Sequence, residues 1–460
     1  MRFWKHTVLA AALTGLALPA FAVDLLETWQ AARAYDSAYA AAFAAAQAGQ
    51  EKAPQARAPL LPQLALSGDY TRGFPEKPLL QPRFRTGNAG AQLTQTLFDW
   101  SKFAALEKGK QAALIATDQL AAAEQDLILR VAQAYFDVLL AEDSLAFTQA
   151  AKQAFAQQLA LAKKSFEVGS LTITDTYEAQ ASYDAAVASE LAADSDLVIK
   201  RNRLQLLAGV NPTTLATLKA KLPLATPSPA DPESWVSRAE AGSYALAIRQ
   251  KQLLIAQKEV EVSRSGHLPS VNLVAGYNDR MTTQMGLNDT RGSSVGVQVT
   301  VPIFSGGYTS SRLREAHALV DQARHDLEEA RRQLELGTRS AFLGVSSGAA
   351  QVTAREQVLQ SSQSQLEATR LGREVGVRTS VDLLNAEQKF YESKRNLAQA
   401  RYQYLQARLQ LAAAVGQLTP EVLAEINALL TARPTVPVLA SNQPKTDKPT
   451  VGRSATAKAK

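Results

Sequence analysis

The segment SFEVGSLTITDTYEAQASYDAA, residues 165–186, is repeated in outline by REVGVRTSVDLLNAEQKFYESK, residues 373–394. Each has a Val-Gly pair, a Thr three residues after the Gly, an Asp three residues further on, and then a helical pattern. The shift of 207 positions between them indicates a duplicated unit of roughly 200 residues, far longer than a solenoid repeat. The same shift relates Val168 to Val375, Gly169 to Gly376, Thr172 to Thr379, Asp175 to Asp382, Arg57 to Arg264, Pro62 to Pro269, Tyr70 to Tyr277 and Gly209 to Gly416.

The duplication predicts the organisation of the whole chain. We expect a signal peptide over 1–22, a first repeat over 23–211, a linker or strap over 212–234, a second repeat over 235–416, a short helix over 417–432 and a disordered basic tail over 433–460. The first repeat should contain a helix from 24 to about 58, a β-hairpin over 60–98, a long helix over 101–168 and a return helix over 173–208. The second should contain a helix, a hairpin over 268–304, a long helix over 308–374 and a return helix over 380–415.

The expected signal peptide has the three usual parts. Arg2 and Lys5 precede a short apolar run, Val8–Leu18, and Ala20-Phe21-Ala22, with its two small residues, is typical of a cleavage site. The alternative is a membrane anchor, but the run is short for a span and Pro19 ends it. The chain contains no cysteine, which excludes disulfides and thiolate metal ligands and suits an exported protein.

The net charge of +6 lies at the two ends of the chain. Arg2 and Lys5 contribute two positive charges, and residues 433–460 carry six Lys or Arg against one Asp. The remainder therefore has a net charge of only −1. A nearly neutral body argues against nucleic acid as a partner.

The two predicted hairpins have strands of alternating polarity. Residues 295–303 place Val and Ile on one face and Gly, Gln and Thr on the other. Alternation over about ten residues is what a tilted membrane-spanning strand requires, although a soluble two-sided sheet would also show it. Two hairpins at equivalent repeat positions favour a barrel. The expected inward polar residues are Asp69, Thr71, Gln92, Thr94, Asn272, Gln298 and Thr300.

Each hairpin leads into a very long predicted helix. Residues 101–166 contain no proline, and as a helix they would span on the order of 100 Å. In the second repeat, apolar or small residues recur at strict three-four spacing, which indicates a coiled-coil seam. In the first repeat the seam steps by four twice near Val131, a stutter that changes the supercoil locally. The second-repeat seam is Leu313, Ala316, Val320, Ala323, Leu327, Ala330, Leu334, Gly337 and Ala341.

Four strands cannot close a barrel, since small single-chain barrels need eight. An open edge in lipid would leave backbone groups unsatisfied, so a membrane-embedded form of this chain must oligomerise. Two chains would give eight strands and a filled interior, whereas three would give twelve strands and room for a lumen. The physical interpretation is an oligomeric conduit.

Several phrases resemble the TolC family of outer-membrane efflux and secretion channels. They are ARAPLLPQLALSGDYT, QLTQTLFDWSKF, AYFDVL, FEVGSLTITD, GHLPSVNL, VPIFSGG and EVGVRTSVDLL, in that order between about residues 23 and 430. The resemblance implies a mainly α protein with membrane β: a homotrimer whose 12-stranded barrel in the outer membrane of a Gram-negative bacterium continues as a 12-helix periplasmic α-barrel. It also implies outer-membrane lipid, a periplasmic adaptor protein and an inner-membrane pump of the proton-driven RND or ABC kind as partners. Drugs, detergents or whole proteins would be the cargo.

The resemblance also assigns roles at the two Val-Gly turns, Gly169 and Gly376, which would lie at the closed periplasmic tip. Thr174 and Asp175 resemble acceptors of the family's gate, and Arg378 resembles the donor that holds the inner coiled coil. Asp382 resembles the acid that constricts the aperture. Two positions depart from the family, with Arg373 at a gate tyrosine and Asn385 at a second ring acid, so the aperture should be less acidic. Arg373 would either pair with Asp175 or extend to water.

Simpler interpretations remain beside the channel. Charges at helix turns are usually solvated, and exposed pairs contribute about 0–1 kcal/mol. His317 and His325 lie eight residues apart, but no HExxH motif or acid cluster accompanies them, so neither a metal site, a cofactor nor an enzyme is expected. The alternative function is a non-conducting periplasmic coiled-coil scaffold or pump adaptor. Such a protein would not need two equivalent alternating hairpins.

Overall fold

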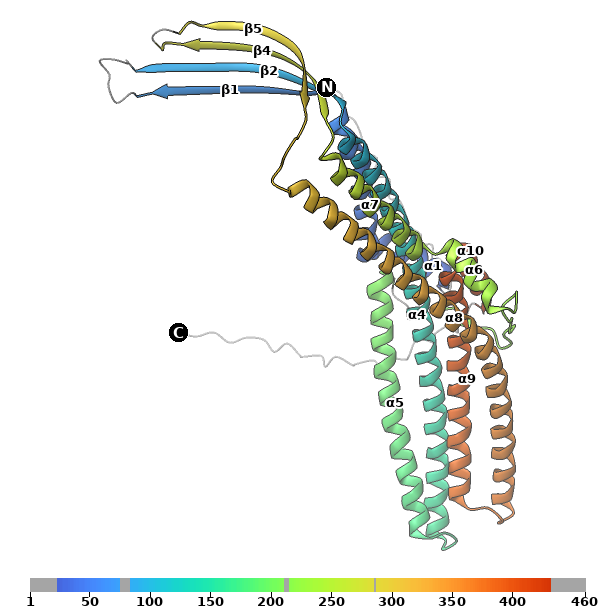
Figure 1. The fold of residues 1–460 in the computed structure, drawn as a ribbon. Coiled ribbons are helices and arrows are strands. Elements are labelled where there is room, and N and C mark those ends of the chain that lie inside the picture. Colours follow the sequence, from blue (N-terminus) through green and yellow to red (C-terminus); the bar gives the residue numbers. More distant parts are fainter. Residues whose placement is uncertain (1–22, 75–82, 211–214, 285–286, 432–460) are drawn as a thin grey trace, which may run out of the picture.

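The computed structural model describes residues 23–74, 83–210, 215–284 and 287–431. The molecule is elongated, with a β-sheet at one end and two helical hairpins at the other (Figure 1). The expected signal peptide and basic tail lie outside the described residues, as does part of the linker, 211–214.

In residues 23–74 and 83–210, the described part of the first half, there are five helices longer than one turn and two strands. They are α1 (Leu25–Tyr35), α2 (Ser37–Gln50), α3 (Lys52–Arg57), β1 (Gln63–Gly73), β2 (Phe84–Phe98), α4 (Trp100–Glu167) and α5 (Ile173–Ala208), with a 3-10 turn η1 (Ala58–Leu60) before β1. The single helix expected from 24 to about 58 was wrong. Asp36 interrupts it, because its carboxylate accepts hydrogen bonds from the backbone N–H groups of Ala38 and Tyr39 and so begins α2.

The second half has a matching order of elements. They are α6 (Pro232–Gly242), α7 (Tyr244–Ser265), β4 (Ser270–Thr282), β5 (Thr290–Thr300), α8 (Tyr308–Glu374), α9 (Ser380–Ala414) and α10 (Pro420–Asn427). The helix before the hairpin is again divided, here at Ser243, whose hydroxyl accepts from the N–H of Leu246. Side-chain caps therefore set the elbows in both halves.

The linker between the halves crosses the helices as a strap. Its strand β3 (Thr217–Leu218) pairs antiparallel with β6 (Leu430–Thr431) near the C-terminal end of the described chain. The hydroxyl of Tyr135 on α4 lies 2.9 Å from the carbonyl oxygen of Ala216 and 3.1 Å from that of Val23. Beneath the strap is the largest core, which includes the fully buried Leu127, Leu139, Tyr404, Leu405 and Leu409.

The sheet has the order β1-β2-β4-β5, with every neighbouring pair antiparallel. Its registers pair Asp69 with Asn88, Gln92 with Gly276 and Asn272 with Gln298. Because side chains alternate along a strand, these pairings place all the expected polar residues on one face. The opposite face carries Leu64, Leu66, Tyr70, Leu93, Leu273, Tyr277, Val295, Val297 and Val299. Within the described chain, the outer edges of β1 and β5 have no partner strand.

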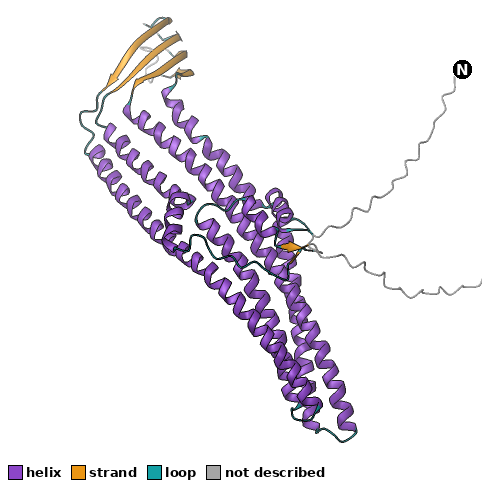
Figure 2. Cartoon of the chain, turned by 90° about the vertical axis from the view of Figure 1, so that its right-hand side faces the viewer, coloured by secondary structure: helices purple, strands orange, loops and turns teal. Residues whose placement is uncertain are grey.

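The long helices pair into two hairpins that reach away from the sheet (Figures 1 and 2). In Figure 1 the four helices stand in the row α5, α4, α9, α8. The two hairpins therefore contact each other through α4 and α9, and α5 and α8 lie at the two edges of the row. We call α4–α5 the outer hairpin and α8–α9 the inner hairpin. Nearer the sheet, α7 packs against both α4 and α8.

None of the helices in the described residues combines enough length with enough apolar character to cross a membrane. The long helices instead carry charges at regular intervals on their exposed faces, as the run of Arg and Glu over 312–339 illustrates.

Candidate functional site: the helical tip

Both hairpins end in the same kind of turn. Gly169 has φ +72° and Gly376 has φ +80°, the left-handed region that glycine adopts without a steric penalty. Open space surrounds the position that a Cβ would take at either residue, so the requirement is one of backbone conformation. In the inner hairpin the N–H of Gly376 donates to Arg373 O at 3.0 Å, and that of Val377 donates to Gly372 O at 2.8 Å. These bonds satisfy carbonyl groups at the end of α8.

Asp175 and Asp382 each complete a capping box. The hydroxyl of Thr172 accepts from Asp175 N at 3.2 Å, and the carboxylate of Asp175 accepts from Thr172 N at 3.0 Å. Thr379 and Asp382 repeat this arrangement at 3.1 and 3.0 Å. Hydrogen bonds from Thr172 and Thr379 lower the pKa of the respective carboxyl groups. The Thr-x-x-Asp spacing was a sequence signal for this role, which our sequence analysis missed.

The four expected gate residues do not meet within one chain. Among the described residues, no ion pair joins Asp175 to Arg373 or to Arg378. Arg378 instead packs back over the end of α8, where a Cβ on Gly372 would lie 2.8 Å from its Cγ. Thr174 is exposed in the first turn of α5.

Arg373 makes a contact that the sequence analysis did not foresee. Its Nη1 donates to Oε1 of Gln158 on α4 at 2.7 Å, which connects the inner hairpin to the outer one. Asp382 and Asn385 lie three residues apart near the start of α9, on one helical face, with Asn385 exposed and Asp382 half-buried.

A buried acid lies one turn beyond them. Glu387 on α9 is 2% exposed, and its Oε1 accepts from Nη2 of Arg370 on α8 at 3.4 Å. Burial raises the pKa of Glu387, against the opposing effect of Arg370. The sequence held a signal for this residue, because Glu387 follows Leu383 and Leu384 at helical spacing. It therefore places a charged side chain at an interior position of the seam.

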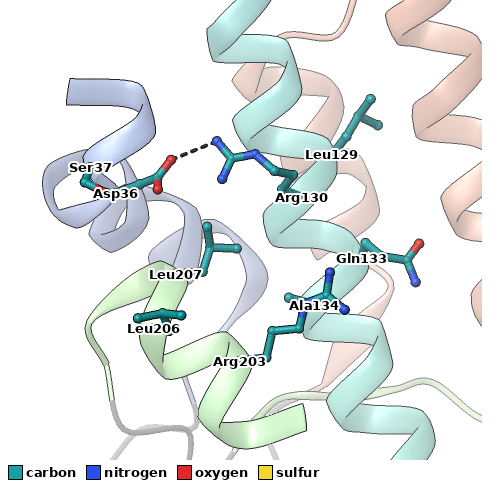
Figure 3. A pocket seen from close by; sticks show the side chains of 9 residues that line it. All are labelled: Asp36, Ser37, Leu129, Arg130, Gln133, Ala134, Arg203, Leu206 and Leu207. Carbon is teal, nitrogen blue, oxygen red and sulfur yellow. Dashed lines mark hydrogen bonds and ion pairs between the residues drawn. The ribbon is translucent and has the colours of Figure 1, made fainter. Parts of the chain in front are cut away.

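A separate cavity of about 510 Å³ lies where α1 and α2 meet α4 and α5 (Figure 3). Arg130 Nη2 donates to Oδ2 of Asp36 at 2.8 Å across it. Burial raises the pKa of Asp36, but the bonds with Arg130 and the backbone of α2 outweigh this and lower it. Leu206, Leu207 and Arg203 complete a mixed lining. Because the carboxylate of Asp36 both caps α2 and pairs with Arg130, it holds the helices together, and the role of this cavity is structural.

The acidic and histidine side chains of the described residues are spread along the chain rather than gathered into a metal site. Across the described ranges, no group of three or more His, Cys, Asp or Glu side chains could hold a metal ion. The arrangement of the molecule is that of a membrane-channel protomer: a sheet with one polar and one apolar face, continued by long helices to a charged tip.

Comparison with known proteins identifies the family. The profile of the outer membrane efflux protein family matches residues 28–210 and 235–417. The chain is 33% identical to the outer membrane protein TolC of Vibrio cholerae, covering 91% of this chain and 96% of that protein. It is 32% identical to the alkaline protease secretion protein AprF of Pseudomonas aeruginosa, covering 85% and 84%. The structure of the Campylobacter jejuni CmeC outer membrane channel shares the fold, with TM-score 0.76 at 16% identity and coverage of 88% and 89%.

The chain therefore belongs to the outer membrane efflux protein family. It is an outer-membrane exit channel of a Gram-negative bacterium, and its family consists of transporters that carry out no enzymatic reaction.

Proposed function

We propose that three copies of this chain assemble into one continuous conduit. The observation that carries the proposal is the pair of matching open edges. The sheet has free edges at β1 and β5, and the row of long helices ends at α5 and α8. In lipid, free strand edges cost several kcal/mol for each unsatisfied group, so β1 of one copy pairs with β5 of the next.

Three copies fit the chemistry of the sheet better than two. An eight-stranded barrel has an interior just wide enough to be filled by side chains, whereas twelve strands leave a lumen. The polar face, with Asp69, Asn88, Gln92 and Asn272, faces that lumen, and the apolar face contacts lipid. The twelve long helices then form the periplasmic tunnel.

The gate lies at the tip, where neighbouring copies meet. Asp175 belongs to the edge helix α5, and Arg378 follows the other edge helix, α8. Thr174 and Asp175 of one copy therefore accept from Arg378 of the next, a contact that a single chain cannot make. Arg373 supplements it within each chain through Gln158. Asp382 and Asn385 form rings around the narrowest point, and Asn385 makes that ring less acidic than two carboxylates would.

The conduit works with a periplasmic adaptor and an inner-membrane RND or ABC pump, as the family resemblance implies. The similarity to an alkaline protease secretion protein favours whole proteins among the cargo, and membership of the outer membrane efflux protein family favours efflux substrates as well. A non-conducting scaffold is the competing function. It leaves the apolar face of the sheet without a role.

The assembly is tested by the mass of the detergent-extracted protein, measured by light scattering with the detergent contribution subtracted. We expect three chains for each particle, and release only by detergent. A monomer released by osmotic shock would contradict the proposal and support the scaffold.

A further inference from the structure

Glu387 is the most deeply buried ionisable side chain at the tip. Its side chain is 2% exposed, yet only one of its carboxylate oxygens is bonded at hydrogen-bonding distance. Oε2 is buried without a hydrogen-bond partner, and the bond from Arg370 to Oε1 is long at 3.4 Å. Arg370 is itself 58% exposed, so water screens much of its attraction. The charge of Glu387 is therefore incompletely compensated.

Three helices enclose this carboxylate. Arg370 and Arg373 approach from α8, and Tyr391 lies on its own helix α9. The neutral Gln158 approaches from α4, and its hydrogen bond to the carboxyl group lowers the pKa of Glu387 without supplying a compensating charge. The adjacent Leu384 packs into an apolar cluster of the outer hairpin with Phe155, Leu159, Ala162, Ala179 and Ala186. We call this contact of α4 with α8 and α9 the docked arrangement. If the inner hairpin moves away from α4, water reaches Glu387.

The energetic consequence follows from the cost of burying a charge. A buried carboxylate with an unpaired oxygen loses hydration that its partners do not fully replace. Separation of the hairpins restores that hydration. The apolar cluster around Leu384 and the Arg373–Gln158 bond favour docking, and the charge of Glu387 opposes them.

We propose that Glu387 holds the docked tip close to its opening threshold, because its buried charge destabilises the closed arrangement and is relieved when the inner hairpin moves outward. This inference rests on the gated channel proposed above. Under this proposal, Glu387 favours opening within each chain, independently of the Asp175–Arg378 contacts between copies.

The shifted pKa of Glu387 predicts how pH changes the stability of the docked arrangement. Burial raises it, and Arg370, Gln158 and Arg373 only partly oppose this. The docked tip therefore binds a proton more firmly than the open tip, and acidification stabilises docking. That effect is lost as the pH rises through the raised pKa. Asp175 and Asp382 have lowered pKa values, so they titrate at more acidic pH and leave a separate window for Glu387.

The test compares single-channel open probability at pH 7.5 for the wild type, Glu387→Gln, Arg370→Gln and the double variant. Glu387→Gln removes the charge and keeps the shape, so we expect open probability to fall about tenfold for each 1.4 kcal/mol that the charge contributes. Arg370→Gln should raise open probability, because it leaves the charge less compensated. The double variant should resemble Glu387→Gln. The matched control is Glu392→Gln, at an exposed acid on the same helix.

A pH series separates this role from a purely structural one. Wild-type open probability should fall as the pH is lowered through the raised pKa of Glu387, and that of Glu387→Gln should stay constant. A rise in open probability for Glu387→Gln would show that Glu387 anchors the tip, and would overturn the inference. So would an unchanged value beside a conducting wild type. Absence of conductance in every folded trimeric variant would instead contradict the channel function itself.

Discussion

The two acids of the repeated turn are, first of all, helix caps. Asp175 and Asp382 bond the backbone of Thr172 and Thr379, and this fixes the entry of α5 and α9 at the tip. A capping carboxylate with a lowered pKa stabilises the fold above its ordinary pKa, and that contribution disappears as the pH falls through the lowered value. The proposed gate role of Asp175 must therefore be measured apart from its capping role.

Comparison of Thr172→Ala with Asp175→Ala distinguishes the capping role of Asp175 from its proposed gate role. Each disrupts the capping box and should lower the stability of the outer hairpin by about 0.5–2 kcal/mol. Only Asp175→Ala also removes the acceptor for Arg378 of the next copy, so it alone should raise conductance several-fold. Thermal unfolding and planar-bilayer conductance measure the two effects. Equal conductance in both variants would leave Asp175 as a cap alone.

Single residues differ in how far the sequence could reveal them. The family resemblance pointed to Asp175 and Arg378 as gate residues, and that role stays a prediction. Glu387 was not singled out: its spacing after Leu383 and Leu384 marks it as a seam position, but its burial also depends on α4, a helix more than 200 residues away in the chain. The partner of Arg373 was missed for the same reason: Gln158 is an ordinary polar residue of a long helix until tertiary packing places it opposite α8.

At the scale of elements, the long helices were predictable because their signals are local. The observed bounds of α4 and α8, Trp100–Glu167 and Tyr308–Glu374, lie within one residue of the expected ranges. In the first repeat the seam positions Leu127 and Val131 are buried, whereas of the nine seam positions predicted in the second repeat only Ala316 is buried and Gly337 is exposed. The helices before the hairpins were harder to predict, because one capping side chain at Asp36 outweighs an otherwise continuous helical pattern.

Substitutions at Gly376, in the turn of the inner hairpin, should destabilise the start of α9. Gly376→Ala places a Cβ residue at φ +80°, which should cost roughly 1–2 kcal/mol. Gly376→Asn should cost less, since asparagine adopts this conformation more readily. Hydrogen exchange of the amides at the start of α9 should accelerate in the alanine variant. Equal exchange in the two variants would mean that the turn changes conformation when substituted.

At the scale of the whole molecule, the described part of one chain leaves strand and helix edges open. Its sheet presents an apolar face and two open edges, and its helices form a row with two free sides. The sequence indicated this through the alternating hairpins and the count of four strands. The strap was not specified in detail, because the pairing of β3 with β6 involves only two residues in each strand and joins positions 217 and 431. Such short, distant pairings leave no periodic signal.

Charged side chains join helices within one chain. The body of the chain is nearly neutral, and its ion pairs, such as Arg339 with Glu233 and Arg331 with Glu240, tie α8 to α6 near the middle of the molecule. Exposed pairs of this kind contribute little individually. In the proposed conduit, the packed core beneath the strap is the fixed part of each chain, and the hairpins move only at the tip.

Single-channel conductance in a planar bilayer shows whether the protein forms a conduit and whether the tip keeps that conduit closed. The purified wild-type protein should show a small, steady conductance. Arg378→Glu removes the donor between copies and places an acid beside Asp175, so its conductance should rise several-fold. A folded trimer that conducts in neither form would contradict the account and leave the non-conducting scaffold.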